Sequence, residues 1–581
     1  MGDSASTAPG FADVRTLDVL DFDEIRASLA RETMSDAGTA AARTLLPSSD
    51  SDRVRDEVMA TSEMRAIVAA DGFALPRVVE TRDAIERARR GSSLSAEDLR
   101  DVAVALAAAD AAVRRVRAAD APILHERCLG AASQGDVIGR IEHAVGPRGD
   151  VLDRASGALA RIRRNIIRAQ DEARDRTQAI LRSPAFAKAV QDQIVTSRAG
   201  RLVVPIKADF AGSVPGVVHD TSASGQTVFV EPLGALEVNN RVRTLLIEEE
   251  REVARILAEL SRAVGAVASA LLVNLEILAV LDLVLARARL ADRMHAVAPI
   301  IVTDAKVDIR GGRHPLLGER AVAQSLVLDH ETRFIVISGP NMGGKTVTLK
   351  LVGLFVAMTG CGMHLPAVEG TTIGSFTRVW ADIGDEQSIA ENTSTFSAHL
   401  RRLRQIVGDA GEHALVLIDE IASGTEPASG AALATAVLEH LLSSGALGIV
   451  TTHSTELKLV AHATPGLVNA SLRFHPQTYA PTYQLDVGTP GQSLAFALAR
   501  TLRLDPAIVR RAEALLSQSA RDYDRALAEL AEIRSSAAAE RDALSEERRH
   551  AATLQESLRR RNESLERERR DFAQKADERL G

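Results

Sequence analysis

A glycine-rich segment in the second half of the chain has the composition of a phosphate-binding loop. A buried-strand pattern at residues 334–337 leads into the loop, and a helical pattern follows it at residues 347–354. In this context the glycines let backbone amides converge on phosphates, Lys345 supplies a cation for the β- and γ-phosphates, and Thr346 offers a hydroxyl to Mg²⁺. We therefore predict an ATP and Mg²⁺ site formed by Gly339, Pro340, Asn341, Met342, Gly343, Gly344, Lys345 and Thr346.

Two further apolar runs end in residues that would complete such a site. Residues 415–418 lead into Asp419 and Glu420, and residues 447–450 are followed closely by His453. Behind a P-loop, Asp419 is expected to be an acidic partner for Mg²⁺, and Glu420 a base that orients and deprotonates the attacking water. His453 occupies the position of an ABC-type switch histidine, which contacts the γ-phosphate and reports its loss. The predicted catalytic residues are thus Glu420, His453 and Lys345.

The elements that must position these residues follow from hydrophobic periodicity. Strands and helices alternate from about residue 299 to residue 515, which predicts an α/β domain. The long upstream segments carry apolar residues at helical spacing. Between them, short β-branched runs separated by glycine and proline predict a small antiparallel meander at residues 202–230. The expected fold is multidomain: a mostly α-helical N-terminal part with a small β insertion, an α/β P-loop domain and a C-terminal helix.

Length and composition narrow the class of protein. A chain of 581 residues is too long for one hydrophobic core. Cys128 and Cys361 are too few for a disulfide framework or a four-ligand zinc site, which favours the reducing cytoplasm. The most apolar segment, residues 264–284, is interrupted by Asn274 and Glu276, and the N-terminus lacks a secretory pattern. We expect a cytoplasmic protein with no membrane partner.

The charge distribution is uneven along the chain. The formal net charge is -8, but residues 140–207 hold 14 Lys+Arg against 7 Asp+Glu, a local charge of +7. Such a segment fits contacts to the phosphates of DNA or RNA. A solvated helix face is the alternative interpretation.

The motifs around the P-loop resemble those of MutS proteins. Residues 392–396, Asn-Thr-Ser-Thr-Phe, stand where an ABC transporter has a Leu-Ser-Gly-Gly-Gln signature, and Gly-Arg-His-Pro at residues 312–315 precedes the loop. Upstream, Val-Pro-Ile-Lys at 204–207, Val-Pro-Gly-Val-Val-His-Asp at 214–220 and Phe-Val-Glu-Pro at 229–232 are similar to the bacterial MutS-II family. That family is a MutS paralogue without the mismatch-recognition domain.

This resemblance implies further site residues and an order of domains. Gln387 falls where MutS-type ATPases have their coupling-loop residue. Ser394 is expected to approach the γ-phosphate bound by the other subunit of a homodimer, with a local helix cap as the alternative. The implied order is a flexible tail (1–16), a helical core (17–150), an Arg-rich helical and β clamp-like insertion (151–232), lever helices (233–298), an ABC-like ATPase and dimerisation domain (299–515) and a coiled-coil helix (516–581).

The implied function is a Mg²⁺-dependent ATPase that acts as a nucleotide-gated clamp on a nucleic-acid assembly. Two partners fit the family: branched recombination DNA, with suppression of recombination, and collided ribosomes, contacted through rRNA, with splitting and rescue. The sequence does not choose between them. An ABC-type ATPase subunit of a transporter or of an SMC-like complex is the alternative class.

The end of the sequence departs from the family pattern. Family members usually continue past the coil into a basic β domain and an Smr nuclease domain, whereas this sequence ends at Gly581. We expect truncation within the coil, and we expect no nuclease activity from the residues present.

Overall fold

The computed structural model describes most of the chain before residue 516. The described residues are 10–340, 344–384, 395–421, 425–475, 478, 480–491, 496, 499–500 and 503–515, with stretches of one to three residues between 540 and 561. The chain divides into two compact units, one formed by Met1–Ile25, Leu46–Val58 and Ala291–Gly581, the other by Arg26–Leu45 and Met59–Leu290. The predicted coiled coil at 516–581 lies almost entirely outside the described residues.

The first unit is built on a mainly parallel six-stranded sheet. Its strand order is β10-β11-β12-β8-β13-β14, parallel except for the antiparallel β14. A second sheet has the order β5-β9-β6-β7. The strands are β5 (Ile300–Val302), β6 (Val307–Gly312), β7 (Gln324–Leu328), β8 (Phe334–Ser338), β9 (Thr372–Gly374), β10 (Arg378–Asp382), β11 (Ala414–Ile418), β12 (Leu447–Thr452), β13 (Leu467–Phe474) and β14 (Pro481–Val487).

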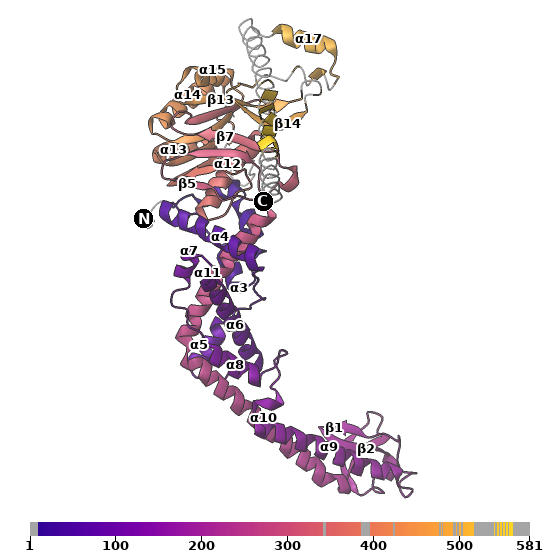
Figure 1. Ribbon diagram of the computed structural model, residues 1–581. Coiled ribbons are helices and arrows are strands. Elements are labelled where there is room, and N and C mark those ends of the chain that lie inside the picture. The colour runs from indigo at the N-terminus through magenta and orange to yellow at the C-terminus, as the bar shows by residue number, and fades with distance from the viewer. Residues whose placement is uncertain are drawn as a thin grey trace, which may run out of the picture. The chain divides into compact units, whose positions relative to one another are not determined.

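Helices cover both faces of the six-stranded sheet (Figure 1). Leu403, Leu438 and Leu457, from three different helices, join the sheet residues in one buried cluster. On the other face, Gly353 packs so closely that an added Cβ would lie 2.9 Å from the side chain of Leu417. The helices are α1 (Val14–Val19), α12 (Lys345–Gly360), α13 (Thr395–Asp409), α14 (Pro427–Ser443), α15 (Thr455–Ala463) and α17 (Pro506–Leu515).

The second unit is mostly helical, and local sequence signals set its helix ends. Ser95 and Asp98 form a capping box at the start of α6, and Ser156 caps α9. The buried carboxylate of Asp282 accepts hydrogen bonds from the backbone N–H of Met34 and Ser35. The helices are α3 (Asp36–Arg43), α5 (Arg82–Arg89), α6 (Ala96–Ala118), α7 (Pro122–Arg127), α8 (Gly135–Ala144), α9 (Gly157–Arg182) and α10 (Leu233–Ala266); α2 (Phe22–Ala30), α4 (Ser51–Asp71) and α11 (Ala268–Arg293) extend into both units.

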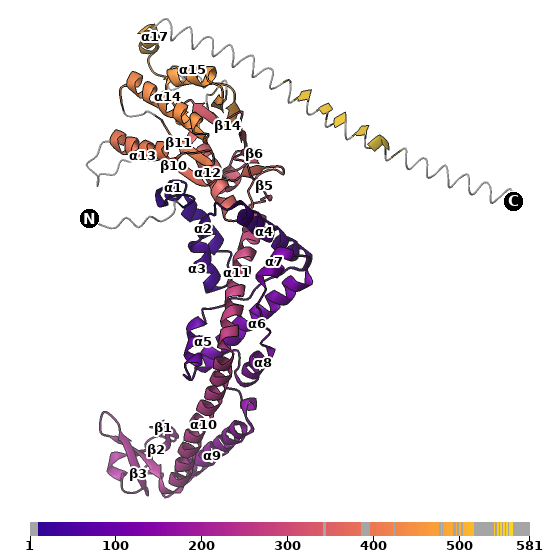
Figure 2. The same ribbon diagram turned by 90° about the vertical axis from the view of Figure 1, so that its left-hand side faces the viewer.

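A small antiparallel sheet stands at one end of the α9 and α10 pair (Figure 2). It consists of β1 (Thr196–Arg198), β2 (Arg201–Lys207), β3 (Gly216–Thr221) and β4 (Thr227–Pro232). Its strand order is β1-β2-β4-β3, so β2 pairs with β4 and not with the next strand β3. The predicted simple meander is therefore wrong in its pairing, although the strands lie at the predicted segments.

The helix α11 is long and apolar enough to cross a membrane by length and composition. Half of its most apolar window is buried inside the protein. Leu278, Leu281 and Leu285 belong to a cluster that also contains residues of α4, α6 and α7. A core helix of a globular unit satisfies the same test, so this helix is accounted for by its packing.

Candidate active site

Three parallel strands of the six-stranded sheet end at the same edge, and each is followed by predicted site residues. Strands β8, β11 and β12 are buried along their whole length, as continuous apolar runs in a parallel sheet should be. Gly339 follows β8, Asp419 follows β11, and His453 follows β12. Ligands of open α/β sheets bind outside these carboxyl ends.

Lys345 begins α12 and is nearly buried. Its Nζ donates to the carbonyl oxygen of Gly339 at 2.8 Å and lies 2.9 Å from Nε2 of His453. An ammonium group can only donate, so Nε2 of His453 accepts and the imidazole is neutral in this arrangement. Burial, followed by the charge of Lys345, lowers the pKa of His453. Burial also lowers the pKa of Lys345, although the charges of Glu420 and Asp419 oppose that shift.

A second cluster links the P-loop helix to the acidic pair. Thr346 donates from Oγ1 to Oδ2 of Asp419 at 2.6 Å, and the hydroxyl of Thr451 donates to the other carboxylate oxygen. The backbone N–H of Glu420 donates to Oγ1 of Thr451 at 2.7 Å. Glu420 has a left-handed backbone conformation (φ 50°), and its Oε1 lies 3.4 Å from Nε2 of His453. The strained turn therefore presents its carboxylate beside the histidine.

The donor set fits magnesium. A hydroxyl and a carboxylate are hard oxygen ligands, and Mg²⁺ is usually held by one or two carboxylates together with substrate phosphates and water. Thr346 and Asp419 supply these two groups from facing elements, 2.6 Å apart. In the described part of the chain no cluster of three or more His, Cys, Asp or Glu side chains could hold a metal by itself.

The sequence interpretation missed Tyr483, whose ring lies beside the P-loop. An added Cβ on Gly344 would lie 3.1 Å from Cδ1 of Tyr483, and Gly344 itself has a φ of 91°, so glycine is needed there. Tyr483 is 46% exposed, and Gln324 donates to its carbonyl oxygen at 3.3 Å. The only available signal was the scarcity of tyrosine, since the chain contains 3 Tyr.

The structure brings together eight of the predicted residues at this edge: Gly339, Pro340, Gly344, Lys345, Thr346, Asp419, Glu420 and His453. Asn341, Met342, Gly343, Gln387 and Ser394 lie outside the described residues. Their predicted roles stay predictions.

The motif residues of the small β sheet meet around one buried carboxylate. Nη1 of Arg201 donates to both oxygens of Glu231 at 2.8 Å, and Nδ2 of Asn239 donates to Oε1 at 2.8 Å. His219 reaches Oε2 at 2.5 Å. Glu231 is fully buried and so ties β2, β3 and β4 to α10. Buried charges are tolerated when they are paired and hydrogen-bonded in this way.

The basic segment divides into arginines that are paired and arginines that face solvent. Arg163 pairs with Asp153 and Glu249, which fixes α9 against its neighbours. Arg161, Arg164 and Arg168 are exposed at helical spacing on one face of α9, and none of them has a carboxylate partner among the described residues. We call these three residues the α9 arginine stripe.

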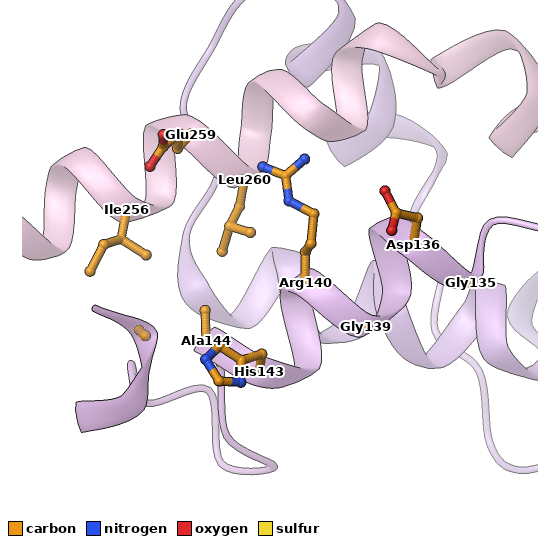
Figure 3. Close-up of a pocket in the computed structure, with 10 residues that line it drawn as sticks. Gly135, Asp136, Gly139, Arg140, His143, Ala144, Ile256, Glu259 and Leu260 are labelled. Atoms are coloured by element: carbon orange, nitrogen blue, oxygen red, sulfur yellow. The ribbon is translucent and has the colours of Figure 1, made fainter. Parts of the chain in front are cut away.

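Arg140, at the start of the basic segment, has different surroundings. It lines a surface cavity of about 490 Å³ between α8 and α10, and the carboxylates of Asp136 and Glu259 line the same cavity (Figure 3). Acidic side chains thus line the same cavity as Arg140, whereas the α9 arginine stripe has no carboxylate partner among the described residues.

The fold and site define a P-loop ATPase domain: a phosphate-binding loop, an acidic pair and a histidine meet at neighbouring strand ends of a mainly parallel sheet. Residues 335–520 match the family model described as MutS domain V. The domain is therefore an ATPase domain of the MutS type.

Comparison with curated proteins gives the family. The chain is 43% identical to the protein named endonuclease MutS2 of Thermomicrobium roseum, over 88% of this chain and 67% of that protein. It is 39% identical to the protein of the same name from Pelotomaculum thermopropionicum, over 97% of this chain and 72% of the relative. The Geobacillus thermodenitrificans protein is 38% identical over 97% and 71%. The chain belongs to the MutS2 family.

Proposed function

We propose that this chain is a homodimeric, Mg²⁺-dependent ATPase whose nucleotide state opens and closes a clamp on a nucleic-acid assembly in the cytoplasm. The observation that supports it most is the contact between Lys345 and His453 next to the contact between Thr346 and Asp419. Side chains of the P-loop helix α12 thereby contact residues that follow β11 and β12. We also propose that each of these side chains has the role that the sequence predicts for it.

In this proposal each side chain acts on a different part of the reaction. Lys345 exchanges its contacts with Gly339 and His453 for phosphate oxygens. Thr346 and Asp419 hold Mg²⁺, which neutralises charge on the phosphates when bound. Glu420 orients the attacking water and accepts its proton. His453, neutral because of its lowered pKa, can donate from one ring nitrogen while the other accepts, so it responds to the presence of the γ-phosphate.

Tyr483 is proposed to bind the base of the nucleotide. An aromatic ring that is half-exposed beside Gly344 offers a flat surface near the phosphate site. Bases stack on such rings with little sequence preference. The fixed position of Tyr483, with its carbonyl held by Gln324, suits a preformed site.

The second half of the site is proposed to come from the partner subunit. Ser394 of one chain approaches the γ-phosphate bound by Lys345 of the other, and Gln387 couples the site to the rest of the domain. Heterodimers carrying Lys345→Ala and Ser394→Ala test this. Lesions on opposite subunits leave one intact composite site and about half of the ATPase rate, whereas both lesions on one subunit damage both sites. The reverse pattern would show that Ser394 acts within its own chain.

The upstream part of the chain is proposed to hold the nucleic acid. Residues 17–150 form the core, 151–232 the clamp-like insertion, 233–298 the lever, 299–515 the ATPase and dimerisation domain, and 516–581 a coiled coil. The α9 arginine stripe lies within the clamp-like insertion and offers three cations to phosphates, where other arginines are held by carboxylates. The relatives' name, endonuclease MutS2, is that of proteins that act on nucleic acid.

Two partners remain to be separated by experiment: branched recombination DNA and the ribosome with its rRNA. The Glu420→Gln protein with ATP and Mg²⁺ should be held in its nucleotide-bound state, because binding remains while water activation is lost. Co-sedimentation with ribosomes is measured beside binding to a four-way DNA junction, with Lys345→Ala as the control that cannot bind ATP. ATP-dependent retention on one partner identifies it. Binding to neither, or binding that is equal in both variants, would contradict the nucleotide-gated clamp.

A further inference from the structure

The chain turns back beside the small β sheet where α9 ends. Pro184 lacks a backbone N–H and disfavours a helical conformation in the residue before it, and α9 ends at Arg182. The returning segment forms an antiparallel bridge to β2 at residue 190 and pairs with β2 again, as β1, from residue 196. Residues 193–195 are therefore held at both ends, opposite the last turns of α9.

A cavity of about 530 Å³ separates this returning segment from α9. We call it the α9 cavity. The last turns of α9, residues 193–195 and Leu202 of β2 line it, where α9 lies beside the small sheet (Figure 1). Leu181 and Leu202 in its walls pack against two different buried clusters, so the cavity is preformed. Its volume lies within the range of about 300–1,000 Å³ that is usual for sites that hold small molecules.

The polar groups of the α9 cavity are positive or neutral. Arg174, Gln178 and Arg182 recur every four residues along α9, so they share one face of the helix. Within the described part of the chain, Arg174 forms no ion pair, and Arg182 donates only to the amide oxygen of Gln178, at 3.3 Å. None of the lining residues is acidic, whereas two carboxylates line the cavity beside Arg140. The α9 cavity therefore favours an anionic group.

The same cavity has an apolar wall that is open to solvent. Ile194 is 57% exposed, and Val195 and Leu202 line the cavity with it. The side-chain amides of Gln178 and Gln193 also line the cavity, and each amide can donate and accept hydrogen bonds. Cations, an apolar wall and amides are the groups that bind the phosphate, the face and the edge of a nucleotide.

We propose that the α9 cavity holds one unstacked nucleotide of the bound nucleic acid, with its phosphate at Arg174 and Arg182 and its base against Ile194. The inference rests on the proposed nucleic-acid clamp, and it names what the clamp recognises: a nucleotide that has left the base stack, as at a junction or in a loop. Arg164 and Arg182 are 18 residues apart, which is about five turns of 3.6 residues. A strand that follows the α9 arginine stripe therefore reaches the cavity on the same side of α9.

The test compares two labelled duplexes that differ in a single base. Each has one unpaired nucleotide, and in the second duplex the unpaired nucleotide lacks its base. The backbone charge is the same in both, so a difference in affinity reports contacts to the base. Binding to the whole chain is measured by fluorescence anisotropy, with and without ATP and Mg²⁺, for DNA and for RNA versions of the pair. We expect wild-type protein to bind the duplex with the unpaired base about tenfold more tightly, and the version with the larger ratio identifies the nucleic acid that the cavity prefers.

Variants separate contacts to the base from contacts to the phosphate. Ile194→Ser should reduce the ratio to about two or less, because the base loses its apolar contact. Ile167→Ser is the matched control, since Ile167 of α9 is 58% exposed and does not line the cavity. Arg174→Gln and Arg182→Gln should weaken binding of both duplexes by a similar factor and leave the ratio unchanged, because both duplexes carry the phosphate.

Equal affinity of wild-type protein for the two duplexes would overturn the proposal, and this comparison needs no variant. An equal fall of the ratio in Ile194→Ser and Ile167→Ser would also overturn it. Thermal melts show whether each variant is folded. ATP-dependent binding that does not distinguish the two duplexes would leave the proposed clamp standing while this inference fails. If wild-type protein binds no nucleic acid in any nucleotide state, the proposed function fails together with the inference.

Discussion

Replacing Arg161, Arg164 and Arg168 together by Gln should reduce the salt dependence of nucleic-acid binding by a calculable amount. The three side chains are exposed on one face of α9 and are not engaged by carboxylates of the described residues. A cation that contacts a phosphate releases condensed counterions, so the logarithm of the binding constant falls with the logarithm of salt by about 0.9 per contact on duplex DNA and about 0.7 on single strands.

The expected magnitude follows from three contacts. The slope should become shallower by about 2.7 for duplex DNA and by about 2.1 for a single strand. Over a fourfold rise in salt, wild-type protein should then lose roughly 40-fold more affinity than the variant on a duplex, and roughly 20-fold more on a single strand. The difference is large enough to be measured in one titration series.

Fluorescence anisotropy with a labelled DNA junction and a labelled rRNA fragment, at about 50 to 200 mM salt, gives the slopes. The matched control replaces three other exposed arginines of the same unit by Gln: Arg114 on α6, Arg262 on α10 and Arg90, which follows the last residue of α5. Both triple variants change the net charge equally, so any difference between them reports the location of the charge and not its total.

An equal change of slope in both variants would refute the α9 arginine stripe as a contact surface, since net charge alone would then explain it. An unchanged slope with lower affinity would indicate damage to the fold of α9. Only a shallower slope that is specific to the stripe supports direct phosphate contacts.

Three further predictions concern the ATPase domain. Lys345→Ala should lose ATP binding, and Glu420→Gln should retain binding but lose hydrolysis, as measured by nucleotide binding and phosphate release; wild-type turnover of Glu420→Gln would overturn its role as the base. Tyr483→Ala should raise the KM for ATP about tenfold, because base stacking is lost, whereas the KM of Tyr483→Phe should stay near the wild-type value. Burial, and then the charge of Lys350, lowers the pKa of His314 from its usual value of 6.5 to about 4. Between these pH values the unfolded chain binds a proton that the folded chain does not, so the free energy of unfolding is highest above pH 6.5 and falls by about 3 kcal/mol towards pH 4. In thermal melts at several pH values, His314→Gln should lose less of this free energy than wild type does.

The strands of the ATPase site could be predicted because their signal is local. Continuous apolar runs before Gly339, Asp419 and His453 correspond to β8, β11 and β12. A strand buried on both faces of a parallel sheet needs apolar residues at every position, so its sequence differs from that of an exposed strand or an amphipathic helix. The types of residue that follow each run then indicate their chemistry.

Contacts between distant parts of the chain gave no such signal. Tyr483 stands on β14 next to an ordinary polar stretch, and its place beside Gly344 depends on how β14 joins β13. Arg402 and Asp13 are 389 positions apart, and each alone resembles an exposed charge on a helix. Pairing over such distances follows from the tertiary fold and cannot be inferred from periodicity.

The strand order of the small β sheet shows a related limit. Alternation and turn residues predicted the strands but not that β4 lies between β2 and β3. The reason is visible in Glu231, which is on β4 and receives Arg201 from β2 and His219 from β3. A buried carboxylate that needs several donors favours the central strand, because donors can then approach from both sides.

The same pairing explains how a chain with a net charge of -8 can offer a surface to a polyanion. Arginines such as Arg163 and Arg201 form ion pairs with carboxylates of the same unit. They therefore stabilise the fold and contribute little to the electrostatic potential at the surface. Arg161, Arg164 and Arg168 lie outside this set of pairs and share one face of α9. Contacts to phosphates depend on charge within about a Debye length, near 10 Å in ordinary buffers. In the proposed contact, the local arrangement of unpaired cations therefore matters more than the total charge of the chain.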